Sequence, residues 1–169
     1  DEGSTFTATG DSTRVTVESN TAGQRGGGMF SSAGADVMVE SGAALVVQRN
    51  TATSEYGGGM YLESEGSTFT ATGNSTRVTV ESNTAGQKGG GMVSLSGADV
   101  MVESGAALVV QKNTATSNYG GGVYLASEGT TFKASGRSTR VSVESNTAGQ
   151  SGGGMFSLSG ADVMVESGA

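Results

Sequence analysis

The sequence predicts an all-β fold, a right-handed parallel β-helix of about five coils, each 31–32 residues long and built from three strands. Two observations lead to this prediction. The motif Val-x-x-Asn, followed by Gly-Gly-Gly and then Met or Val, occurs five times, and its triplets begin at Gly26, Gly57, Gly89, Gly120 and Gly152. Between the motifs, short runs rich in Val and Thr alternate apolar and polar residues, as half-buried strands do. Strand-forming repeats of this length indicate a solenoid, and crossovers between parallel strands are right-handed.

The strands of the first two coils are expected where these runs fall. They cover residues 5–9, 13–19 and 28–32 in the first coil, and residues 36–40, 44–49 and 59–63 in the second. Branched side chains suit a pleated surface, and Gly, Ser, Asn and Asp bound each run. Stacking the coils about 4.8 Å apart places equivalent residues in columns. The expected interior columns are Val17, Val47, Val80, Val110 and Val143; Phe6, Val37, Phe69, Val100, Phe132 and Val163; and Met29, Met60, Met92, Val123 and Met155.

A second period, of 63 residues, overlies the coils. Gly3, Gly66 and Gly129 each begin a similar segment of eight residues, and every 63-residue unit holds two related coils. No linker interrupts the pattern, so we expect residues 1–169 to form a single β-helix segment. A solenoid needs polar caps on its end coils, and neither end of the sequence has the pattern of a cap. We therefore expect the segment to belong to a longer array.

Composition argues against several kinds of partner. The chain has no cysteine, which removes disulfides, thiolate metal sites and cysteine nucleophiles. Its net charge of -7 disfavours nucleic acid as a partner. No apolar stretch approaches the length of a membrane span, so we expect no membrane insertion by this segment. The glycine triplets are followed by neither Lys-Ser/Thr nor a helix, so they do not form a phosphate loop. We expect no cofactor and no metal site.

The asparagine of each motif falls at the bend after the Val strand. Asparagine caps backbone groups in turns and tolerates left-handed backbone, and stacked amides can form a hydrogen-bonded ladder. The alternative is a row of amides that bind a ligand, and we favour the structural ladder. The residues of this column are Asn20, Asn50, Asn83, Asn113 and Asn146.

A column of mostly aromatic residues follows the inward Met column by one position. Because side chains alternate along a strand, these residues are expected to point outward as a stripe. Exposed apolar stripes mark contact surfaces for sugar rings or for another copy of a solenoid, whereas stacking alone would only stiffen the sheet. The members are Phe30, Tyr61, Val93, Tyr124 and Phe156.

The acidic residues recur with the repeat, which argues against an enzyme. A glycosidase-type centre needs a local, asymmetric group of acids and bases. Glu18 instead has equivalents at Glu81 and Glu144. We expect no catalytic residues, and we expect Arg14, Arg77 and Arg140 to neutralise partly the glutamate four residues further along.

Ice binding is a second alternative, because Thr5-x-Thr7-x-Thr9 resembles the threonine rows of ice-binding β-helices. In the next coil the same outward positions are Asp36, Met38 and Glu40, which breaks the array at every second coil.

The paired motifs also resemble a known family. Val-x-x-Asn with Gly-Gly-Gly-Met is similar to the Phe-x-x-Asn and Gly-Gly-Ala-Ile repeats of chlamydial polymorphic outer-membrane proteins, and of related extracellular repeat proteins. This resemblance implies a right-handed β-helix at the cell surface, of the autotransporter-passenger type, with adhesive roles. The chain departs from the family's pattern at two positions in each motif: Val replaces Phe, as at Val17, and the third Gly replaces Ala, as at Gly28.

Together these observations predict a non-enzymatic extracellular or cell-surface protein that acts as a rigid spacer or filament with an adhesive surface. The expected partners are other copies of the chain, bound end to end or laterally, and glycans or other extracellular matrix and surface proteins. Two alternatives stay open: a carbohydrate-binding or carbohydrate-active β-helix, and an ice-binding β-helix.

Overall fold

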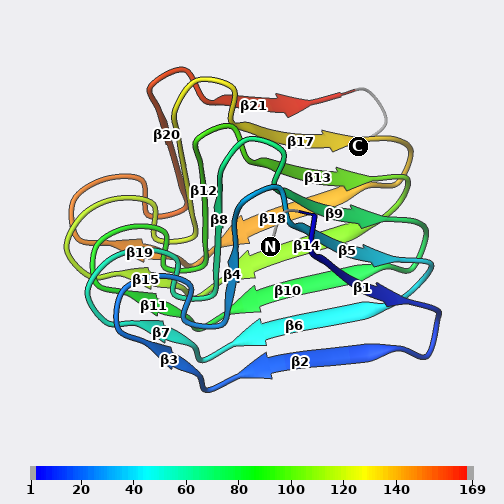
Figure 1. Ribbon diagram of the computed structural model, residues 1–169, viewed down its shortest axis with the longest axis horizontal. Helices are drawn as coiled ribbons and strands as arrows, with labels where there is room; N and C mark the ends of the chain where they lie inside the picture. Colours follow the sequence, from blue (N-terminus) through cyan, green and yellow to red (C-terminus); the bar gives the residue numbers. More distant parts are fainter. Residues whose placement is uncertain (1–2, 167–169) are drawn as a thin grey trace.

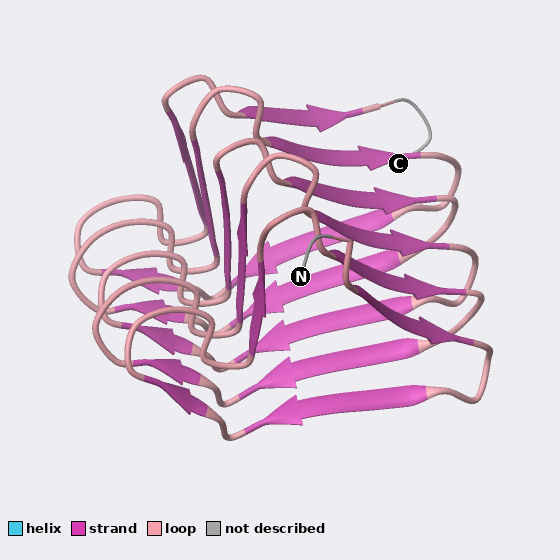
Figure 2. Ribbon diagram, viewed as in Figure 1, coloured by secondary structure: helices cyan, strands magenta, loops and turns pink. Residues whose placement is uncertain are grey.

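The computed structural model describes residues 3–166, which form a stack of coils made of strands and turns, without a helix (Figure 1). All strand pairs are parallel and join neighbouring coils. Hydrogen bonds therefore run along the stack, and each coil pairs with the coils on either side. The longer strands line up from coil to coil and form broad parallel sheets along the stack, as Figure 2 shows.

The strands form four sheets, each with one strand from every coil. Sheet A consists of β1 (Thr5–Thr9), β5 (Asp36–Glu40), β9 (Thr68–Thr72), β13 (Asp99–Glu103), β17 (Thr131–Ser135) and β21 (Asp162–Val165). Sheet B consists of β2 (Arg14–Glu18), β6 (Ala44–Gln48), β10 (Arg77–Glu81), β14 (Ala107–Gln111) and β18 (Arg140–Glu144). Sheet C consists of β3 (Thr21–Ala22), β7 (Thr51–Ala52), β11 (Thr84–Ala85), β15 (Thr114–Ala115) and β19 (Thr147–Ala148). Sheet D consists of β4 (Met29–Ser31), β8 (Met60–Glu63), β12 (Met92–Leu95), β16 (Val123–Ala126) and β20 (Met155–Leu158).

Three of these sheets correspond to the three strands expected in each coil, with bounds that differ by at most one residue in the first two coils. Sheet C is the addition. Its strands are only two residues long, Thr-Ala, which is too short to show a periodic pattern in the sequence. They lie between the asparagine bend and the loop that leads to sheet D, and these loops project to one side of the stack (at the left in Figure 2).

The interior is lined by the columns expected from the sequence, except at Val163, which is 45% exposed because no further coil covers it among the described residues. Register pairs Phe6 with Val37 and Val37 with Phe69, so large and medium side chains alternate from coil to coil. On the same strands Ala8 pairs with Val39 and Val39 with Ala71, the opposite alternation of size. Each layer therefore keeps a similar volume, which dense packing requires. Val80 in sheet B and Met92 in sheet D are buried in this same core.

At the bend after sheet B, the left-handed conformation is taken by the residue before each asparagine and not by the asparagine itself. The residues with positive φ, between 54° and 57°, are Ser19, Arg49, Ser82, Lys112 and Ser145. A left-handed conformation disfavours every residue except glycine by about 1–2 kcal/mol. The asparagine is thus free to turn its side chain inward.

We expect Ser82→Gly to raise the free energy of unfolding by about 0.5–1 kcal/mol, because glycine relieves the strain of the left-handed backbone at φ 56°. The greater conformational entropy of glycine in the unfolded chain offsets part of this gain. The control is Ser142→Gly within β18, where the backbone is extended and glycine should lower stability. Chemical denaturation measures both. A loss of stability in both variants would contradict the strain at Ser82.

Candidate functional site

The asparagine column lies inside the coil as a continuous hydrogen-bonded ladder. The Oδ1 atom of Asn83 accepts from the backbone N of Asn50 at 2.9 Å and from its Nδ2 at 3.1 Å. The Nδ2 atom of Asn83 donates to Oδ1 of Asn113 at 3.0 Å and to the carbonyl oxygen of Val47 at 2.9 Å. Asn50, Asn83 and Asn113 are fully buried. With every donor and acceptor engaged inside the protein, these amides hold the bends together and are closed to a ligand.

The third glycine of each triplet packs against this ladder. A Cβ atom added at Gly59 would lie 2.6 Å from the carbonyl oxygen of Gly91 and 2.9 Å from Nδ2 of Asn83. Gly28, Gly91 and Gly122 have the same surroundings in their own coils. The close approach of the backbone to the amide excludes any side chain, alanine included. This is the physical reason for glycine at the third position of the triplet.

The aromatic column does not form the exposed stripe expected from its alternation. Its residues do point away from the main core, but Tyr61 is 1% exposed, Val93 0% and Tyr124 4%, whereas Phe30 in the first coil is 53% exposed. The loops between sheets C and D fold back over the outer face of sheet D. Tyr56 and Tyr119 in these loops, with Leu95 and Phe156 on sheet D, complete a second hydrophobic cluster. The column is thus a second core and offers no open contact surface, except at Phe30.

Two cations from the same loops are part of this second core. The Lys88 ammonium lies 5.3 Å from the ring centroid of Tyr56, 5.9 Å from that of Tyr119 and 4.8 Å from that of Tyr124. Its Nζ also donates to the Tyr124 hydroxyl at 3.2 Å. Arg25 covers Tyr61 at 5.5 Å and pairs with Glu55 and Glu63 at 2.8 and 3.3 Å. Cations over partly desolvated rings contribute about 1 kcal/mol each, so these loops are anchored to the sheet.

Burial raises the pKa of the Tyr61 phenol to about 12, and the neighbouring Glu63 carboxylate adds to the effect. The folded state therefore keeps a proton that the unfolded chain releases near pH 10. This contribution to stability is complete below pH 10 and is lost as the pH rises through 12.

We expect the wild type to lose on the order of 2 kcal/mol of stability between pH 9 and pH 12 through this residue. Tyr61→Phe should show a shallower alkaline decline, as measured by denaturant unfolding across this range. The matched control is Tyr56→Phe, in the same cluster. Equal declines in wild type and Tyr61→Phe would contradict the burial of the phenol.

The outer face of sheet B carries a column of exposed arginines that sequence reasoning misassigned. Residues four apart on a strand are about 13 Å apart, so Arg14 cannot neutralise Glu18. Glu18 instead pairs with Arg49 of the next coil, and Glu81 pairs with Lys112 at 2.9 Å. The hydrogen bond from Lys112 lowers the pKa of Glu81, and the hydrogen bond from Gln111 lowers it by a smaller amount. Within residues 3–166, Arg14, Arg77 and Arg140 have no ion pair or side-chain hydrogen bond.

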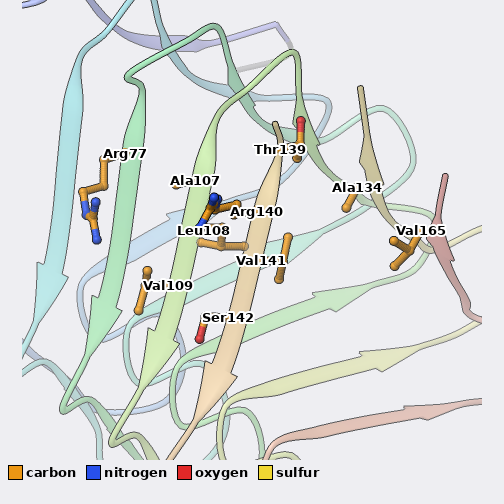
Figure 3. A pocket seen from close by; sticks show the side chains of 10 residues that line it. All are labelled: Arg77, Ala107, Leu108, Val109, Ala134, Thr139, Arg140, Val141, Ser142 and Val165. Atoms are coloured by element: carbon orange, nitrogen blue, oxygen red, sulfur yellow. The ribbon is translucent and has the colours of Figure 1, made fainter. Parts of the chain in front are cut away.

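A groove of about 570 Å³ lies at the end of this column (Figure 3). Arg77 and Arg140 come from two strands of sheet B, with Ala107 of the intervening strand in register between them. The small alanine leaves the space between the arginines open. The groove continues over β18, the last strand of sheet B, toward Leu108 and Val141 of the coil interior. The sequence alone shows that these arginines recur at equivalent positions. That they are unpaired follows only when the spacing of a strand, and not that of a helix, is used to find their neighbours.

The outer face of sheet A is acidic and bears directly on the ice-binding alternative. Register pairs Thr5 with Asp36 and Asp36 with Thr68, so threonine rows recur only at every second coil. Six carboxylates lie on this face, from Asp36, Glu40, Asp99, Glu103, Asp162 and Glu166. Lys133 is the one basic residue among the sheet A strands, and it pairs with Glu166 at 3.0 Å. The face presents alternating hydroxyl and carboxylate rows.

No group of three or more His, Cys, Asp or Glu side chains in residues 3–166 is arranged to hold a metal ion. A search of the same residues for a helix long and apolar enough to cross a membrane finds none.

Comparison with known proteins identifies the class. The family model of the right-handed β-helix region matches residues 2–148, so the chain belongs to the right-handed β-helix family. The predicted fold and handedness are confirmed. No curated protein and no solved structure matches the chain. The family includes both enzymes and non-catalytic proteins, so membership does not decide between them. It also does not single out the chlamydial repeats, and that resemblance stays a prediction.

Proposed function

We propose that this β-helix repeat protein acts as a rigid spacer or filament segment outside the cell or at its surface, with an adhesive rather than a catalytic role. The observation that carries the proposal is that every column repeats along the stack. The buried asparagines, the core valines and the surface carboxylates recur from coil to coil or from unit to unit. A catalytic centre needs a local group of acids and bases, whereas a spacer needs uniform coils.

The axial hydrogen bonds support a stiff rod. Every coil is joined to its neighbours through the strand ladders and, at the bend, through the asparagine ladder. In such a stack stability is a sum over coils and their interfaces, so length can be extended by adding units. The location outside the cell rests on the resemblance of the motifs to surface repeats.

Electron microscopy of the protein lengthened by further 63-residue units, together with a glycan array, tests this proposal. We expect straight rods whose length grows by about 9.6 Å for each added 63-residue unit, the height of two coils. Glycans retained without being cleaved would place the adhesive role in sugar binding. Particles whose length does not grow with the added units, or flexible chains that lengthen irregularly, would contradict the spacer.

The carbohydrate-active alternative is tested with polysaccharide cleavage assays on wild type and on Glu18→Gln. Glu18 pairs with Arg49 and accepts a hydrogen bond from Gln48 at 3.0 Å. We expect no cleavage by either protein. Cleavage by the wild type that the substitution abolishes would replace the proposed function with an enzymatic one.

A further inference from the structure

We infer that the protein associates laterally with a second copy of itself, the acidic outer face of sheet A in one molecule docking on the arginine-bearing outer face of sheet B in the other. The inference goes beyond the spacer role, because a rod can span a distance without binding its neighbours. If molecules do not associate, the rods seen by electron microscopy would still be straight. Failure of the lateral association can therefore be distinguished from failure of the spacer role.

The arginine column supplies one half of the contact. Arg14, Arg77 and Arg140 are exposed, and within residues 3–166 no carboxylate pairs with them. Ala44 and Ala107 separate them in register, so each guanidinium is accessible from above the sheet. Guanidinium groups bind carboxylates with two parallel hydrogen bonds, which makes unpaired arginines suited to an acidic partner.

The glutamates of sheet A supply the other half. Glu40, Glu103 and Glu166 recur at every second coil, as the arginines do, because each set occurs once in every 63-residue unit. Both columns therefore have the same axial spacing, about 9.6 Å. In any alignment of coils, each arginine within the overlap lies within one coil spacing, about 4.8 Å, of a carboxylate row. The side chain of arginine is long enough to span this offset.

Charge favours a second copy over a free anionic polymer. The whole chain carries a net charge of -7, which repels polyanions at long range. A second copy has the same overall charge, but it also presents an ordered acidic face. The spacing of its carboxylates matches that of the arginines because both sets recur once in every 63-residue unit. The centres of the two faces are partly apolar, with Met38 and Met101 on sheet A and Val109 on sheet B.

The size of the faces indicates that the association is weak for five coils and grows with length. Five strands of five residues cover roughly 400 Å², about half of what each partner buries in a standard interface. Because the two docking faces differ, the contact is head-to-tail and leaves a free face on each molecule. Such contacts extend into open lateral arrays, and every additional unit adds another set of ion pairs.

Sedimentation equilibrium at low ionic strength tests the inference on the full chain. We expect concentration-dependent association that is about tenfold weaker at 0.5 M than at 0.05 M salt, since surface ion pairs are screened. One variant, Arg14→Glu with Arg77→Glu and Arg140→Glu, should be monomeric. A second, Glu40→Lys with Glu103→Lys and Glu166→Lys, should also be monomeric. The glutamates are used because Asp36 accepts a short hydrogen bond from Thr68, at 2.6 Å, and an Asp99 side-chain oxygen is buried. Within residues 3–166 the Glu40 side chain has no such contact, Glu103 accepts only a 3.3 Å bond from Ser135, and Glu166 pairs with Lys133 on the same face.

Mixing the two variants supplies the decisive result, because each then presents the charge that the other needs on both faces. We expect the mixture to associate at least as strongly as the wild type. Ser54→Lys with Ser117→Lys, at equivalent exposed positions in the turns between sheets C and D, controls for net charge and should associate as the wild type does. Thermal unfolding shows that all variants are folded. The inference would be overturned if the wild type stayed monomeric at millimolar concentration, also if it bound a sulfated polysaccharide through the arginines instead. A mixture of the two variants that stayed monomeric would overturn it as well.

Discussion

Asn83→Ala is expected to lower the free energy of unfolding by about 4 kcal/mol, among the largest effects of any single substitution in the chain. The side chain accepts two hydrogen bonds from Asn50 and donates to Val47 and Asn113, all in the buried interior. Truncation would leave the backbone N of Asn50 without its acceptor and would remove one hydrogen bond from the Asn50 Nδ2, which keeps Val17 as an acceptor, and one from the carbonyl of Val47. Each buried polar group that loses its partner costs about 1–3 kcal/mol.

The chain offers a matched control for this prediction in Asn20. Its side chain occupies the first position of the same ladder, is exposed, and donates to Oδ1 of Asn50 at 3.0 Å. After Asn20→Ala that oxygen still accepts from the backbone N of residue 20. We expect a loss below about 1 kcal/mol, measured by chemical denaturation. Equal losses of stability in the two variants would mean that the buried hydrogen bonds of the ladder do not stabilise the protein more than the exposed bond of Asn20 does.

Gly91→Ala is the second large effect, expected at about 3 kcal/mol through overpacking. The added Cβ would meet the carbonyl oxygen of Gly122 at 2.6 Å and Nδ2 of Asn113 at 2.9 Å. Both contacts belong to the neighbouring coil, so relief requires the coils to separate and the ladder to open. Neither the glycine nor its equivalents have positive φ, so backbone strain does not contribute.

Gly154→Ala is the matched control, because Gly154 occupies the equivalent position in the fifth coil. Its added Cβ would meet only Cγ1 of Val143, at an ordinary distance of 3.6 Å. Replacing glycine by alanine without a clash stabilises a protein slightly, by about 0.4–1 kcal/mol, through the unfolded state. We expect the two substitutions to change stability in opposite directions. A destabilisation of similar size at both positions would show that contact with the ladder of the next coil is not what requires glycine.

The coil period and the interior columns could be predicted because both follow from short-range patterns. Val15 and Val17 alternate with polar residues, and the same alternation recurs in the coils that stack on them. Repetition turns a weak local signal into a strong one, since equivalent positions must share an environment. For the same reason a recurring asparagine after each Val strand indicated a ladder.

The covering of sheet D could not be predicted in this way. The alternation places Tyr61 opposite the inward Met60, and its direction along the strand is as expected. Whether an outward side chain meets solvent depends on the path of a loop that has no periodic pattern. The cations of that loop, Arg25 and Lys88, were the only available signal, because a cation that alternates with tyrosine in a column suggests stacking.

The arginine column was misread for a different reason. Pairing of residues four apart is a rule for helices, where they lie one turn apart. In a strand the partner of Glu18 lies in the next coil, as Arg49 does. Applying the strand geometry consistently would have left Arg77 unpaired and would have pointed to sheet B as an accessible face.

Hydrogen exchange of the asparagine side-chain amides, followed by NMR, tests most directly whether the stack is built around a buried ladder. The Nδ2 protons of Asn50, Asn83 and Asn113 should exchange at least about a thousandfold more slowly than exposed amides, because they are released only when coils open. The exposed amide of Asn20 should exchange rapidly. Rapid exchange at all of these positions in the folded protein would contradict the ladder and the register of coils that depends on it.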